Sequence, residues 1–269
     1  LILTIALTVL TGIPDNEDAP DFYSLLLGAT IGMMIMASAN NLLMLFLGVE
    51  MASVPSYAMV GFLKGRKPSS EAALKYVVYG AGAAGVMLYG ISLVAGVLGT
   101  GDMSLMAERL SIVAESGSAG FGDPEVRTVA LGVMLVMVGL AFKLSLVPFH
   151  FWCPDAFEGA SAEVAGFLSV ASKAGAFALL VRFCIGLSGV PATAELMTAF
   201  GIGLGAIACV TATFGNLAAY TQRNIKRLLA YSTIAHAGYM LMAVAALLVM
   251  INSGSAKALT HDINACIGG

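Results

Sequence analysis

The stretch GLAFKLSLVPFHFW, residues 139–152, decides the fold of this chain. Lys143 stands in an apolar run of membrane-spanning length, and Pro148 follows five residues later. A charge at the centre of a membrane helix costs roughly 2.5–3.5 kcal/mol, and proline removes a helical hydrogen bond. Membranes tolerate broken helices where these line a polar cavity. We therefore predict a transmembrane helix that is interrupted between Lys143 and Phe151, with a function for its buried charge.

The composition of the whole chain agrees with a membrane protein. Hydrophobic residues make up 59% of it and charged residues only 11%, whereas soluble domains carry about 25% charged residues. The 31 glycines fit as well, because small residues let transmembrane helices approach closely. The formal net charge of −3 and the absence of a basic run argue against nucleic-acid binding.

The apolar runs predict an all-α, polytopic transmembrane bundle over residues 22–251, because an open sheet would leave backbone groups unpaired in lipid. A span needs about 20 residues. Residues 1–12 look like the end of an earlier helix, residues 252–269 stay unassigned, and we expect the chain to be truncated at both ends. The seven predicted spans are 22–39, 41–63, 72–98, 127–149, 162–187, 198–220 and 227–251.

The loops between these spans alternate in charge. Segments 64–71 and 221–227 carry the basic residues, whereas 99–126 and 188–197 are poor in lysine and arginine. The positive-inside rule places the first pair of loops in the cytoplasm or its equivalent. Two basic loops separated by four spans support the span count.

Three further charges fall within predicted spans. Glu50 lies in mid-span without a local partner, and Lys173 is equally deep in its own span. Buried ions of opposite sign are costly when alone, so we expect Glu50 and Lys143 to face each other, with charged atoms about 4–6 Å apart or joined by water. Lys75 stands near a helix start, where it either has a function, snorkels or pairs with Glu71 four residues earlier.

Several polar residues keep two interpretations. His150 follows Lys143 by seven residues, two helical turns on one face, or else caps a broken helix. Asp155, Glu158 and Glu163 are typical of acids favoured at a helix N-terminus. His236 fits core packing and a hydrated path equally well. The scattered cysteines and histidines do not indicate a metal site or a disulfide.

Four segments carry a family resemblance: residues 37–62, 69–81, 139–177 and 215–241. In their order and their charges they resemble subunit N (subunit 2) of respiratory complex I, the proton-pumping NADH:quinone oxidoreductase. The resemblance covers most of residues 22–250. The motif SSEAALKY, residues 69–76, separates this subunit from its two larger antiporter-like relatives in the same complex.

The resemblance implies roles for five residues in proton translocation. It makes Glu50 the glutamate of the fifth family helix, Lys143 the lysine of the broken seventh and Lys173 the central lysine of the eighth. Lys75 becomes the accessory lysine of the sixth helix, and His150 the histidine after the break. Family members have about fourteen helices and a further lysine on the twelfth; this chain stops after the tenth.

The implied function is proton translocation coupled to quinone reduction elsewhere in the complex. The resemblance implies no cofactor in this subunit; NAD, FMN, iron–sulfur clusters and quinone belong to partner subunits. Expected partners are other membrane subunits, including the larger antiporter-like ones, and the lipid bilayer of a bacterial or organelle inner membrane. The alternatives are an Mrp-type monovalent cation/proton antiporter and a structural scaffold with vestigial charges.

Overall fold

The computed structural model describes residues 1–11, 18–63, 65–116, 123–188 and 194–252. Seven helical stretches in this part of the chain are long and apolar enough to cross a membrane, which confirms the predicted all-α bundle. They are α2 (Ala19–Ser38), α3 (Leu42–Val60), α4 (Lys67–Leu98), α6 (Pro124–Leu144), the run Ala162–Gly186, α10 (Ala194–Tyr220) and α11 (Ile225–Asn252).

The run Ala162–Gly186 is not one regular helix. It consists of α8 (Ala162–Phe167), the π-helical segment η1 (Leu168–Ser172) and α9 (Lys173–Gly186). Three short helices complete the described chain: α1 (Ile2–Thr11), α5 (Met106–Ser116) and α7 (Trp152–Gly159). The unassigned residues 253–269 lie outside the described part.

Two predicted boundaries need correction. Helix α4 begins at Lys67, five residues before the predicted start, with Pro68 in its first turn, where proline is well tolerated. Helix α6 begins at Pro124 and ends at Leu144, so the predicted span 127–149 includes the break. The side chain of Asp123 caps α6 by accepting a hydrogen bond from the amide of Glu125 at 2.8 Å.

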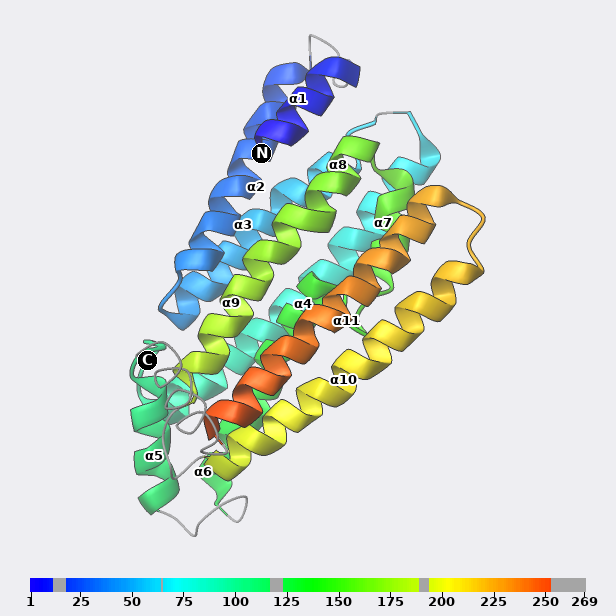
Figure 1. Ribbon diagram of the computed structural model, residues 1–269. Helices are drawn as coiled ribbons and strands as arrows, with labels where there is room; N and C mark the ends of the chain where they lie inside the picture. The colour runs from blue at the N-terminus through cyan, green and yellow to red at the C-terminus, as the bar shows by residue number, and fades with distance from the viewer. Residues whose placement is uncertain (12–17, 64, 117–122, 189–193, 253–269) are drawn as a thin grey trace, which may run out of the picture.

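The helices pack along one another (Figure 1). Helix α2 packs on α3 and α9, α4 packs on α6 and α7, and α11 packs on α10 and α7. Glycine allows the α4–α6 contact: a Cβ atom on Gly90 would lie 2.6 Å from the carbonyl oxygen of Gly132. Close approach of this kind is typical of membrane helices.

Both basic loops lie at one end of the bundle, as the charge pattern predicted. The loop before α4 and the loop before α11 flank α7, because Lys75 of α4 and Arg227 of α11 both pair with Asp155 of α7. Lys64 lies outside the described residues. This end, where α7 and α8 lie in Figure 1, is called the basic end below.

Candidate functional site

The helix that carries Lys143 is interrupted, as predicted. Helix α6 ends at Leu144, Ser145 adopts a left-handed conformation with φ of 59°, and α7 begins only at Trp152. The amide of Leu146 donates to the carbonyl of Ala141 at 2.8 Å and that of Ser145 to Phe142 at 3.0 Å. This pair of bonds is the Schellman pattern that satisfies a helix C-terminus.

Neighbouring helices satisfy other groups of the break. The amide of Val147 donates to the hydroxyl of Thr211 on α10 at 3.1 Å. The indole of Trp152 donates to the carbonyl of Phe142 at 2.8 Å and stacks on Tyr76 of α4 with ring centroids 4.2 Å apart. Irregular backbone at membrane depth thus finds partners within the protein, as it must in lipid.

Lys143 is fully buried, with 1% of its surface exposed. Its Nζ donates a hydrogen bond of 2.9 Å to Oγ of Ser53 on α3. Glu50, half-buried one turn earlier on α3, interacts electrostatically with this lysine. No ion pair within 4.0 Å joins the two among the described residues. The structure therefore places Glu50 and Lys143 within electrostatic reach of each other, and their separation of 4–6 Å, or a water that joins them, stays a prediction.

His150 does not share a helix face with Lys143, because the break separates them; that expectation was wrong. The histidine is 3% exposed, and its ring lies 4.6 Å from that of Phe214, centroid to centroid. Its Nδ1 is buried without a hydrogen-bond partner, as is Oγ of Ser145. Two polar atoms in the break therefore retain the capacity to bind water.

Lys173 is the second buried lysine, with 3% of its surface exposed. It begins α9 directly after η1, and its Nζ donates a hydrogen bond of 3.0 Å to the carbonyl of Thr233 on α11. Single π-helical turns are frequent at functional sites. No pattern in the sequence indicated this π-helical turn.

A cavity of about 570 Å³ lies beside Lys173, between the run Ala162–Gly186 and α11. Six of the fourteen residues that line it are polar and the others are apolar, and it is called the polar cavity below. Its wall contains two lysines, Lys173 on α9 and Lys226 on α11. His236, which has two interpretations in the sequence, also lines it. The other polar side chains of its wall are Ser169, Ser232 and Thr233.

Lys75 is not buried: 41% of its side chain is exposed. It pairs with Glu71 at 2.8 Å, as the helical spacing allowed, and with Asp155 at 2.9 Å. Arg227 binds Asp155 at 2.7 Å and Glu158 at 2.8 Å. The network joins α4, α7 and α11, so Asp155 and Glu158 do more than favour a helix start. The sequence indicated this network only indirectly. Asp155 and Glu158 follow the break, and segments 64–71 and 221–227 were predicted to lie on the same side of the membrane.

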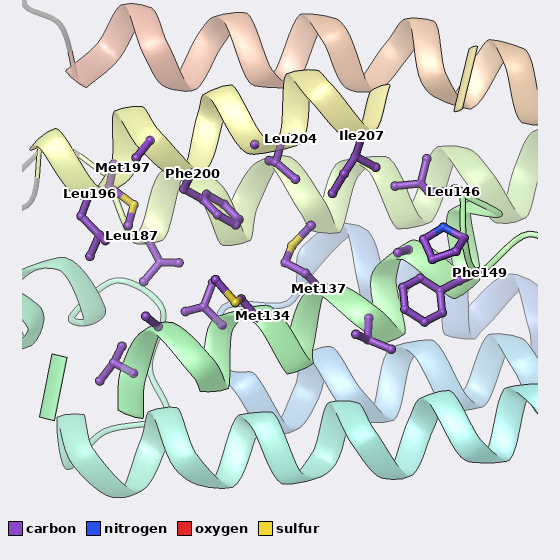
Figure 2. A pocket seen from close by; sticks show the side chains of 18 of the residues that line it. Met134, Met137, Leu146, Phe149, Leu187, Leu196, Met197, Phe200, Leu204 and Ile207 are labelled. Carbon is purple, nitrogen blue, oxygen red and sulfur yellow. The ribbon is translucent and has the colours of Figure 1, made fainter. Parts of the chain in front are cut away.

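An apolar groove of about 430 Å³ separates α6 from α10 (Figure 2). Met134 and Met137 line it from α6, Phe149 from the break, and Phe200 and Leu204 from α10. All residues of its wall are apolar. Within the described residues no group of three histidine, cysteine or acidic side chains could hold a metal ion.

Comparisons with known proteins agree on one family. A family model described as NADH:quinone oxidoreductase/Mrp antiporter, TM matches residues 39–263. The chain is 41% identical over 239 residues to NADH-quinone oxidoreductase subunit N 2 of Chloroherpeton thalassium, covering 88% of this chain and 45% of that one. The chain thus spans about half the length of the curated relatives it matches.

Two solved structures share the fold. A chain of respiratory complex I from Thermus thermophilus is 37% identical, with a TM-score of 0.66, over 83% of this chain and 44% of that one. A chain of the Mrp complex from Dietzia sp. has a TM-score of 0.69 at 23% identity, over 82% of this chain and 38% of that one. The second likeness concerns the fold alone.

Proposed function

Because the chain belongs to the NADH:quinone oxidoreductase/Mrp antiporter transmembrane family, we propose that it translocates protons as a membrane subunit of an NADH:quinone oxidoreductase. The observation that carries the proposal is the pair Lys143 and Lys173. Each lysine is at most 3% exposed, and each donates a hydrogen bond to a neighbouring helix. Intramembrane ionisable groups of this kind typically mark proton relays.

The two lysines and Glu50 form a switch with two charge arrangements. A charged Lys143 is stabilised by Glu50, whereas a proton on Lys173 opposes a second one on Lys143, because like charges repel strongly where water is scarce. Either lysine can release its proton and be recharged. His150 and Ser145 in the break offer positions for the water that carries it. Lys75, which pairs with Glu71 and Asp155, contributes a positive charge at the basic end.

The redox chemistry belongs to other subunits in this proposal. NAD, FMN, iron–sulfur clusters and quinone serve electron transfer in the partners, and protonation changes along the membrane subunits are coupled to it. The partners include other membrane subunits, among them larger antiporter-like ones. The seven apolar helices make the chain an integral membrane protein, and we place it in a bacterial inner membrane because its curated relatives are bacterial.

The Mrp-type antiporter is less well supported. The identity is 37% to the complex I chain and 23% to the Mrp chain, and the curated relatives carry the subunit N name. Purification separates the two functions: a complex I subunit is isolated with flavin and iron–sulfur proteins. Sodium-dependent proton exchange by a complex that lacks them would favour the antiporter.

The proposal is tested by replacing Lys143 in the assembled complex. NADH-driven proton uptake by sealed vesicles should fall severely for Lys143→Ala, because the buried site loses the lysine that carries the proton. Lys67→Ala is the matched control: Lys67 is an exposed lysine at the start of α4 and should leave uptake unchanged. Full uptake by an assembled Lys143→Ala complex would exclude the proposed relay.

A further inference from the structure

Helix α7 reaches the surroundings of both buried lysines with two consecutive residues. The indole of Trp152 donates to the carbonyl of the residue directly before Lys143. Sγ of Cys153 lies 3.9 Å from Oγ1 of Thr233, and the carbonyl of the same threonine accepts the hydrogen bond of Lys173. The position of α7 therefore affects what surrounds each lysine.

The chain before α7 does not fix that position, because the helical hydrogen bonds of α6 end at the break. Helix α7 itself has only eight residues, Trp152–Gly159, whereas a helix in isolation is marginal below about 12–15 residues. Its place in the bundle depends on its neighbours, and it packs mainly on α4 and α11.

Two consecutive basic residues in the first turn of α11, Lys226 and Arg227, bind the far end of α7 and are called the basic pair below. Nη1 of Arg227 donates to the carboxylates of Asp155 at 2.7 Å and Glu158 at 2.8 Å. Nζ of Lys226 donates to the carbonyls of Glu158 at 2.7 Å and Ala160 at 2.9 Å. The carbonyls at a helix C-terminus lack helical partners, and a cation there also complements the helix dipole.

Helices α7 and α11 thus meet at two levels. The basic pair forms the first contact, at the basic end, and Cys153 with Thr233 forms the second. Thr233 follows Lys226 by seven residues, on the same helix face and about 10 Å further along α11. Two contacts at different heights fix both the register and the tilt of one helix against the other, whereas a single contact would leave α7 free to pivot.

The bonds of the basic pair contribute more to position than to overall stability. The side chains of Arg227, Asp155 and Glu158 are between 25% and 38% exposed, and ion pairs with such exposure add little to the stability of a fold. Charge-assisted hydrogen bonds are nevertheless short and directional. A displacement on the order of 1 Å, even one that starts far from the reacting groups, is enough to impair a reaction.

We propose that Lys226 and Arg227 are positioning residues for proton translocation: they hold α7 against α11 and thereby keep the surroundings of Lys143 and Lys173 in place. The inference rests on the proposed proton translocation and deepens it, because it names two residues that act on the buried lysines through α7. The basic pair itself carries no proton.

Hydrogen exchange in the assembled complex tests the position of α7 without any pumping assay. Arg227→Gln removes the charge that binds the two acids of α7. The matched control is Arg223→Gln, which removes the same charge from the loop before α11; Arg223 is exposed, and no ion pair joins it to α7 within the described part of the chain.

We expect the amides of residues 152–160 to exchange about fivefold faster in Arg227→Gln, which corresponds to roughly 1 kcal/mol of local opening. Arg223→Gln should keep the parental rates. Parental rates in Arg227→Gln, or equal acceleration by the control, would show that the basic pair does not hold α7. These rates decide the matter even if the complex proves not to pump protons.

The ratio of protons taken up to electrons transferred then tests whether the position of α7 matters for function. Arg227→Gln should lower this ratio about twofold or more in an assembled complex, and Arg223→Gln should not. Arg227→Lys should restore both the ratio and the exchange rates, because a single nitrogen of Arg227 makes both bonds and an ammonium group has three donors. A parental ratio in Arg227→Gln, or no recovery with lysine, would overturn the positioning role.

Lys226→Met provides a second variant if Arg227→Gln does not assemble. It keeps an unbranched side chain and deletes the two bonds to the carbonyls at the end of α7. We expect exchange of residues 157–160 to become about threefold faster, with a lowered proton-to-electron ratio. Parental values of both quantities would exclude Lys226 as a positioning residue.

Discussion

The polar cavity and the apolar groove are two spaces of similar size in the same bundle, and they differ in what lines them. Six of the fourteen residues that line the polar cavity, between the run Ala162–Gly186 and α11, are polar: two lysines, a histidine and three residues with hydroxyl side chains. The groove between α6 and α10 presents methionine, phenylalanine and aliphatic side chains only (Figure 2). Water enters polar cavities and leaves apolar ones dry.

The difference has a consequence for Lys143, because the groove ends at the broken segment that follows it. Val147, Pro148 and Phe149 form that end of the groove. The apolar wall offers water no partner from the side of the groove, so water at the break depends on Nδ1 of His150 and Oγ of Ser145. Lys173 instead has hydroxyl side chains and a histidine beside it in the wall of the polar cavity, although both lysines are equally buried.

The largest stability effect should come from making the groove polar. Leu204→Asn places an amide without a partner in the apolar wall, where Leu204 is 3% exposed. We expect a loss of about 3 kcal/mol, from the lost leucine contacts and the buried amide. Thermal denaturation in detergent measures it.

Ser232→Ala is the matched change in the polar cavity, and it should alter stability by less than about 0.5 kcal/mol. Equal effects of the two variants would mean that the two spaces do not differ in hydration, and the comparison would fail.

A smaller loss should follow from loosening the break between the two spaces. Trp152→Phe keeps an aromatic ring for Tyr76 and deletes the hydrogen bond to the carbonyl of Phe142. The carbonyl retains the amide of Ser145 as a donor, so we expect a cost of about 1 kcal/mol. An unchanged melting temperature would show that the indole bond does not fix the break.

The smallest effect should come from the ion pairs at the basic end of the bundle. Asp155→Asn weakens the pairs with Lys75 and Arg227, which are partly exposed. Such pairs contribute little, so the expected loss is less than about 1 kcal/mol, and it should shrink as salt screens the charges. A loss above that of Leu204→Asn would reverse the proposed order.

The membrane bundle and its buried charges were predictable because their signals are local. Glu50, Lys143 and Lys173 stand out as charges within apolar runs, and Pro148 marks the break five residues after Lys143. The spans follow from run length, so only their ends differ from the helices observed.

The partners of those charges were not predictable. Ser53 binds Lys143 across 90 residues, Asp155 binds Lys75 across 80 and Thr233 binds Lys173 across 60. Such contacts depend on which helices pack together, and no local pattern encodes that choice. The same holds for η1 and for the spaces left between helices. His150 was misplaced because a helical face was assumed to continue through the break.

The central claim is that Lys173 lies on the proton path, and the proton-to-electron ratio of an assembled complex tests it most directly. Sealed vesicles containing Lys173→Ala should oxidise NADH with a proton uptake per electron well below that of the parent. Lys173→Arg should be impaired too, because arginine keeps its proton. A parental ratio in the assembled Lys173→Ala complex would contradict the account and remove Lys173 from the path.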